Sequence, residues 1–162
     1  MLAHREPRKP RQASLRRGVS AAYYAVFHRL VEEATREIVP GRNDALRQRV
    51  GRAVNHGDVR KLCRSLVTWN VRQSPHPLDE LLGGPPSPDV VRIAEGFVAL
   101  QQARYEADYD MARRFVRDDV DRLVELADDV FLALKRLERG GNERRVFLYA
   151  LAFHAHWKRV GA

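Results

Sequence analysis

The chain has 162 residues, of which 44% are hydrophobic and 31% are charged, so it can bury a core and is richer in apolar residues than a disordered chain. No apolar run approaches the length of a membrane span, and no apolar segment follows the first basic residues as in a secretory signal, so we expect a cytoplasmic protein without membrane contact. The single cysteine, Cys63, excludes an internal disulfide and suits a reducing compartment.

Positive charge is concentrated at the start of the chain. The net charge is +8, and residues 1–17 hold six basic residues against one glutamate. Because Pro7 and Pro10 lie among these charges, residues 1–12 are predicted to form a basic, mobile arm. Such an arm attracts a phosphate backbone without reading its sequence, and it serves equally well as a solubilising tail. The sequence leaves both interpretations open.

The predicted elements are all helices. Apolar residues recur at helical spacing over several stretches, and no stretch alternates with a period of two for long enough to predict a strand. Pro40-Gly41 stops the first helix, Gly57-Asp58 is expected to make a break, and Ser87-Pro88 caps a later helix. The expected helical ranges are 13–38, 44–54, 59–67, 89–107, 116–138 and a last helix that begins at Asn142.

Residues 70–88 form a Pro/Gly-rich region. Five prolines and Gly83-Gly84 exclude a long helix there, although Leu78 to Leu82 is expected to form a single turn. We therefore expect an all-α fold, an up-and-down bundle of four to five helices. It forms one domain over residues 13–158, with a short tail over 159–162.

The first predicted helix carries a stripe of polar residues. Ser20, Tyr24 and His28 are spaced at i, i+4 and i+8, so they share one helix face. Tyr23 and Phe27 lie beside this stripe, among the apolar residues that are expected to enter the core. A helix used only for packing rarely carries serine, tyrosine and histidine in line, so the stripe indicates a polar site.

Four motifs, taken in order, resemble a HEPN domain over most of the chain. Each motif is unspecific alone, whereas their order and spacing together are more specific. They are residues 20–28 in the first helix, His56-Gly57-Asp58, Arg104 to Asp110 where a long helix ends, and Arg144 to Phe147 at the start of the last helix.

The resemblance implies a bundle of four or five helices that commonly forms a homodimer. Many HEPN proteins resemble toxins or defence effectors that cut RNA without a metal, at a site shared by two copies. Their signature is an arginine followed after four to six residues by a histidine, often with a tyrosine next to it. The arginine neutralises a phosphate and the histidine transfers a proton.

This chain departs from that signature. After Arg104, Asp108 stands where the histidine is expected, and Tyr109 follows it directly. A carboxylate is a poor proton donor at neutral pH, so the resemblance alone does not carry nuclease activity over to this chain. Whether the protein is an enzyme stays open, since Arg104 and Asp108 are also interpretable as an ion pair at a helix end.

The candidate site residues follow from the resemblance and from the stripe. The catalytic candidates are Arg104, Asp108, Tyr109 and His28, of which His28 would supply the missing imidazole from the first helix. The candidates for binding RNA or phosphate are Arg16, Arg17, Tyr24 and His56. His28 and His56 each have an alternative interpretation as packing histidines. The chain has one cysteine and no group of carboxylate and histidine residues at metal-ligand spacing. We therefore expect neither a metal site nor a cofactor.

Two functions are compatible with these residues. The first is a HEPN-domain protein that binds RNA or nucleotide in a toxin–antitoxin, defence or stress system, and its cleavage activity, if present, is that of a metal-independent endoribonuclease. The second is a catalytically inactive helical interaction module that binds a partner protein such as a nucleotidyltransferase. The basic arm and Arg104 favour the first, and the replaced histidine favours the second.

Overall fold

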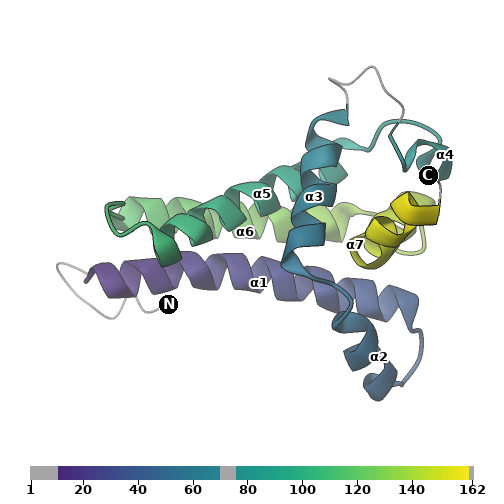
Figure 1. The fold of residues 1–162 in the computed structure, drawn as a ribbon, viewed down its shortest axis with the longest axis horizontal. Coiled ribbons are helices and arrows are strands. Elements are labelled where there is room, and N and C mark those ends of the chain that lie inside the picture. The colour runs from purple at the N-terminus through teal and green to yellow at the C-terminus, as the bar shows by residue number, and fades with distance from the viewer. Residues whose placement is uncertain (1–10, 70–75, 161–162) are drawn as a thin grey trace.

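The computed structural model describes residues 11–69 and 76–160, and all regular structure within them is helical (Figure 1). The prediction of an all-α fold is therefore confirmed. Almost all of the expected basic arm, residues 70–75 of the Pro/Gly-rich region and the last two residues of the expected tail lie outside this description. The helices are α1 (Gln12–Ile38), α2 (Asp44–Gly51), α3 (His56–Val67), α4 (Asp79–Leu82), α5 (Pro88–Tyr109), α6 (Arg117–Arg136) and α7 (Asn142–Val160).

The three longest helices form the body of the bundle. In Figure 1, α5 and α6 lie along α1, α3 crosses one end of them, and α7 closes the same end. α5 runs antiparallel to both α1 and α6, in agreement with an up-and-down arrangement. The described residues contain seven helices rather than the expected four to five, because α2, α3 and α4 are short, separate helices.

Side-chain caps mark the starts of several helices. Ser87 accepts a hydrogen bond from the backbone N–H of Val90 and Pro88 occupies the first turn, as predicted for the start of α5. The predicted break at Gly57-Asp58 is wrong, because Asn55 accepts from the N–H of Asp58 and starts α3 at His56. The predicted turn at 78–82 is present as α4.

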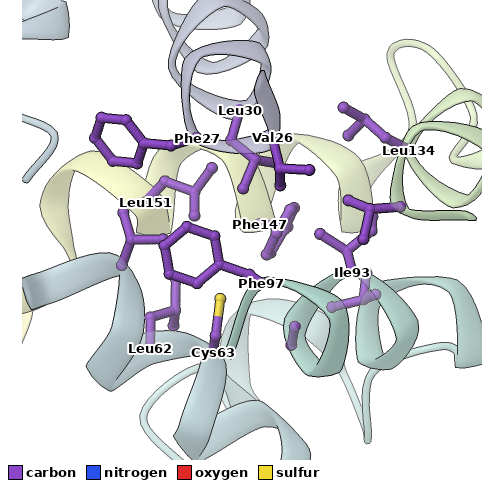
Figure 2. Close-up of a cluster of buried hydrophobic side chains, with 14 of the residues drawn as sticks. Val26, Phe27, Leu30, Leu62, Cys63, Ile93, Phe97, Leu134, Phe147 and Leu151 are labelled. Carbon is purple, nitrogen blue, oxygen red and sulfur yellow. The ribbon is translucent and has the colours of Figure 1, made fainter. Parts of the chain in front are cut away.

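The main core lies where α1, α3, α5, α6 and α7 meet, and Figure 2 shows part of it in close-up. Phe97 of α5 and Phe147 of α7 are buried at its centre, facing Val26 and Leu30 of α1. Removing a buried phenylalanine side chain costs about 3–5 kcal/mol, so these residues contribute strongly to the fold. Cys63 is also fully buried, and burial raises the pKa of its thiol.

A smaller cluster lies at the opposite end of the long helices. Leu15 and Val19 of α1 pack there with Ala107 of α5 and Phe115 of the α5–α6 connection. A Cβ at Gly18 would lie 2.9 Å from a methyl group of Val120, so the glycine permits a close approach of α1 to α6. This cluster fixes the last turns of α5 against α1. Within residues 11–69 and 76–160, no helix combines the length and the apolar character that a membrane span needs.

Candidate functional site

Two polar pairs join α1 to the last turns of α5. The Tyr24 hydroxyl accepts a hydrogen bond from Nη2 of Arg104 at 3.0 Å, and the Ser20 hydroxyl donates to Oδ1 of Asp108 at 3.0 Å. The other carboxylate oxygen, Oδ2 of Asp108, lies 2.7 Å from Nε of Arg104. This last contact is an ion pair without hydrogen-bond alignment, since the Nε atom has no hydrogen-bond partner.

The two pairs follow directly from helix geometry. Ser20 and Tyr24 are four residues apart on α1, and Arg104 and Asp108 are four residues apart on α5, so each pair of residues shares a helix face. Because the two helices are antiparallel, the earlier residue of α1 meets the later residue of α5. The polar stripe predicted on the first helix therefore faces the Arg104 motif.

Aromatic rings surround the guanidinium of Arg104. Its Cζ atom lies 5.5 Å from the ring centre of Tyr24, 5.9 Å from that of Tyr23 and 6.0 Å from that of Tyr109. Such distances give cation–π attraction. Burial opposes the charge of Arg104, but the electrostatic influence of its neighbours, led by Tyr24 and Asp108, outweighs burial and leaves its pKa above the ordinary value.

His56 lies behind these tyrosines, at the first residue of α3. The Tyr23 hydroxyl and Nδ1 of His56 are hydrogen-bonded at 2.5 Å, and the His56 ring stacks on Phe27 with the ring centres 3.7 Å apart. Burial, and then the charges of Arg104 and His28, lower the pKa of His56. Burial raises the pKa of Tyr23 to about 12. At neutral pH the imidazole is therefore neutral and the phenol keeps its proton.

We define the Arg104 site as Arg104, Asp108, Tyr24, Tyr23 and His56. Its ion pair is partly open to solvent, because the side chains of Arg104 and Asp108 are 24% and 32% exposed although Nε of Arg104 itself is buried. Tyr109 extends the site outward, since it is 64% exposed and packs beside Tyr105, which is 56% exposed, with the ring centres 5.0 Å apart. The site thus combines one accessible cation with an exposed aromatic surface.

The structure separates two further candidates from this site. His28 lies one turn beyond Tyr24 on α1 and is exposed, with its ring centre 6.0 Å from that of Tyr24. No contact joins His28 directly to the ion pair, although its charge lowers the pKa of His56. Arg17, another candidate, is exposed at the N-terminal end of α1.

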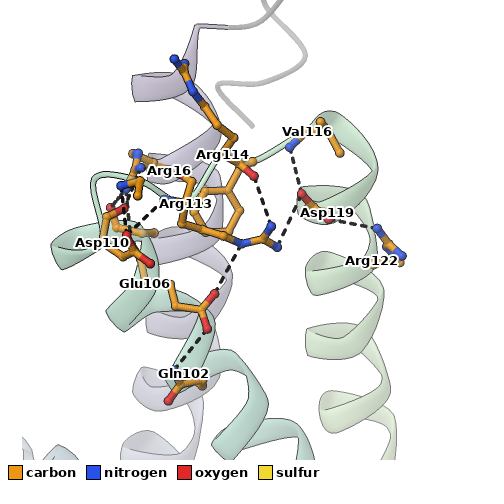
Figure 3. Close-up of polar contacts among 12 residues, drawn as sticks. Arg16, Gln102, Glu106, Asp110, Arg113, Arg114, Val116, Asp119 and Arg122 are labelled. Atoms are coloured by element: carbon orange, nitrogen blue, oxygen red, sulfur yellow. Dashed lines mark hydrogen bonds and ion pairs between the residues drawn. The ribbon is translucent and has the colours of Figure 1, made fainter.

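Arg16, a further candidate, makes hydrogen bonds to the backbone at the end of α5, as Figure 3 shows. Its guanidinium donates to backbone carbonyls at the end of α5 and beyond it, at 2.7 Å to Ala107, 2.9 Å to Asp110 and 2.6 Å to Arg113. Carbonyls at a helix C-terminus have no partner within the helix, and Arg16 satisfies them. The residue therefore holds the α5–α6 connection, and its donors are already in use.

A second set of side chains fastens the same connection (Figure 3). Arg113 lies 3.5 Å from the carboxylate of Glu106 and 3.9 Å from that of Asp119. Asp119 in turn accepts from the backbone N–H of Val116 at 2.9 Å, which caps the start of α6. These contacts hold the end of α5, so Asp108 and Tyr109 are presented from a fixed helix.

Sequence reasoning missed the part played by Tyr23. Its spacing with Phe27 assigned it to the core, and it is indeed fully buried, but its hydroxyl orients His56. The available signal was the hydroxyl group, because the hydroxyl of a buried tyrosine usually finds a hydrogen-bond partner. Among the described residues, no group of three or more histidine, cysteine, aspartate and glutamate side chains could hold a metal ion.

Comparison of the chain with family models, with curated proteins and with solved structures finds no match. The resemblance to HEPN domains therefore depends on the four motifs and remains a hypothesis. The geometry of the Arg104 site and its chemistry carry the functional argument.

Proposed function

We propose that this protein is a HEPN-like helical protein that binds single-stranded RNA or nucleotide at the Arg104 site. The observation that carries the proposal is a partly exposed guanidinium beside the exposed Tyr109, whose ring packs in turn beside the exposed Tyr105. Arginine recognises phosphate through several parallel N–H donors, and aromatic rings stack with unpaired bases. Phosphate and base are the two parts that every ribonucleotide presents.

Charge elsewhere in the chain supports the same ligand. The net charge is +8, and six basic residues lie within the first seventeen positions. A chain of this charge attracts polyanions, and the attraction weakens as salt rises. Non-specific attraction would bring RNA to the surface, and the Arg104 site would then contact individual nucleotides.

We expect binding without cleavage. Attack of a ribose 2′-hydroxyl on phosphorus needs a base for that proton and an acid for the leaving oxygen. His56 is neutral at pH 7 because its pKa is lowered, so it is suited to accept a proton. Asp108 offers a carboxylate, which is a poor proton donor, and Tyr23, with a pKa of about 12, holds its proton too tightly to be an effective acid. The site therefore lacks a good proton donor.

The proposal is tested by RNA binding to Arg104→Ala. We expect about a tenfold loss of affinity for a short single-stranded RNA, since a charge-assisted hydrogen bond contributes about 1.5–3 kcal/mol. The slope of log K for RNA binding against log salt concentration should decrease in magnitude by about one. Fluorescence anisotropy over a range of salt concentrations measures both quantities.

The matched control is Arg49→Ala, which removes the same charge from the exposed face of α2, at the far end of α1. Affinity should change less than twofold in this variant, because only general attraction is lost. Equal losses in the two variants would show that RNA is held by net charge alone and would contradict the proposal. RNA turnover in the presence of a chelator, absent from Arg104→Ala, would contradict the expectation of binding without cleavage.

A specific observation favours the second function, a helical module that binds a partner protein. Asp108 already neutralises Arg104, and Ser20 holds Asp108 in place. The exposed residues Tyr105, Tyr109 and Met111 would then form the contact surface for a second copy or for another protein. Sedimentation equilibrium of wild type and Tyr109→Ala distinguishes this function, since loss of self-association in the variant would assign the tyrosines to a homodimer.

A further inference from the structure

A second concave region lies between α1 and α6 and is bordered by the start of α7. Its volume is about 840 Å³, which is within the range of sites for small organic ligands. Phe131 and Leu134 of α6, together with Ala25 of α1, give it an apolar wall. None of these three residues belongs to the Arg104 site. We refer to this region as the α1–α6 cleft.

Buried charge forms the floor of the cleft. Arg144 donates to Oε2 of Glu33 at 2.6 Å, and the two side chains are only 6% and 8% exposed. The other oxygen of Glu33 lies 2.8 Å from Arg29 and 4.0 Å from Arg36. One carboxylate therefore faces three guanidinium groups.

A second carboxylate does not balance this excess. Glu32 lies 2.5 Å from Arg36 and 3.9 Å from Arg29. Two carboxylates thus share three arginines, which leaves one positive charge uncompensated in the network. Arg29 and Arg144 line the cleft together with both carboxylates, so their charges balance there, and Arg36 is not part of the lining.

The excess positive charge of the cleft comes from Lys135 and Arg139. Both residues line it and are exposed, and Asp128 is the remaining carboxylate of the lining. A cationic ligand would meet Glu33, but the oxygens of that carboxylate are already paired with arginines. An anion would instead meet Lys135 and Arg139, which together carry one more charge than Asp128 balances.

We propose that the α1–α6 cleft binds an organic anion that carries an aromatic or aliphatic body. Its acidic group is held by Lys135 and Arg139, and its apolar body packs against Phe131 and Leu132, which also line the cleft. The inference combines two independent properties of the cleft, an apolar wall and an excess of cations. It does not depend on RNA binding at the Arg104 site.

The experiment uses a matched pair of probes with the full chain. 8-Anilinonaphthalene-1-sulfonate is an aromatic anion whose fluorescence rises in an apolar site, and N-phenyl-1-naphthylamine has the same rings without the sulfonate. We expect saturable binding of one sulfonate probe per chain, with at least about tenfold weaker binding of the neutral amine, since an ion pair in a partly closed site contributes more than one at the surface. Equal affinities for both probes would show a purely apolar site and would overturn the proposal.

Two double variants locate the probe. Lys135→Ala with Arg139→Ala should weaken binding of the sulfonate probe by about tenfold. Lys61→Ala with Arg64→Ala removes the same charge beside another concave region, between α3 and α5, and should leave binding unchanged. The reverse result would assign the probe to that other region and overturn the proposal. Arg104→Ala should also leave binding of the sulfonate probe unchanged. A failure of the cleft proposal is therefore distinguishable from a failure of RNA binding at the Arg104 site.

Discussion

Two arginine–carboxylate pairs of the molecule differ in their surroundings: Arg144–Glu33 joins α7 to α1, whereas Arg104–Asp108 lies within α5 on the side that faces α1. Arg144 and Glu33 are at most 8% exposed, and Arg144 also donates to the carbonyl of Leu134 at 2.9 Å. Arg104 and Asp108 are 24% and 32% exposed, and their closest contact is not aligned as a hydrogen bond. Both pairs join a guanidinium to a carboxylate, so burial and hydrogen-bond alignment are what distinguish the structural pair from the pair that a ligand can reach.

Breaking the buried pair should have the largest effect on stability. Arg144→Ala leaves Glu33 buried with less compensation, which costs about 3–5 kcal/mol. The neighbouring Arg145, whose side chain is 56% exposed and lies 3.3 Å from Glu37, provides the matched control. Arg145→Ala should cost no more than about 1 kcal/mol. Urea unfolding followed by circular dichroism measures both values, and similar values would remove the basis of the comparison.

Neutralising the open pair should affect binding more than folding. Asp108→Asn removes a negative charge from the side of Arg104 but keeps the shape of the side chain. We expect affinity for single-stranded RNA to rise about fivefold, close to 1 kcal/mol, because phosphate no longer competes with a carboxylate. The unfolding midpoint in urea should change little. A fall in RNA affinity would mean that Asp108 positions Arg104 for the ligand rather than competing with it.

His56 should make stability depend on pH. Its pKa in the folded protein lies below 6.5, the ordinary value that applies to the unfolded chain. The unfolded chain therefore binds the proton more tightly, and the contribution to stability is complete above pH 6.5 and is lost as pH falls through the folded pKa. Urea midpoints at about pH 7.5 and pH 5 should differ less in His56→Gln than in wild type. An equal difference in both proteins would exclude His56 as the source.

The smallest effect is expected for Ser20→Ala. The Ser20 hydroxyl donates one exposed hydrogen bond to Asp108, and such a bond contributes at most about 0.5–1 kcal/mol. Thermal unfolding should show a small decrease in Tm, and RNA affinity should change less than twofold. A larger loss of affinity would place Ser20 among the residues that organise the Arg104 site.

The sequence predicted those parts of the structure that have local causes. Helical periodicity identified the class, and Ser87-Pro88 identified the start of α5. The i, i+4 spacings on α1 and α5 placed Tyr24 and Arg104 on faces that do meet. The start of α3 was misjudged because glycine at position 57 suggested a break, whereas the Asn55 side chain is a stronger local signal.

Other features have no local cause. Glu33 and Arg144 are 111 positions apart, so only the packing of α1 against α7 brings them together. The sequence identified Arg16 as a cation that could bind phosphate. It did not identify the acceptors of Arg16, which include a carbonyl at a helix end some ninety residues later. In both cases the residue type was visible in the sequence, and its partner was set by tertiary structure.

The pairing of Ser20 with Asp108 and of Tyr24 with Arg104 also has a consequence for folding. Apolar helix faces tolerate more than one sliding position, because small and branched side chains repack at modest cost. A shift of α5 by a single residue along α1, about 1.5 Å, would break both polar pairs at once. The two pairs therefore select one register between α1 and α5, in the way that a buried polar residue selects the register of a coiled coil.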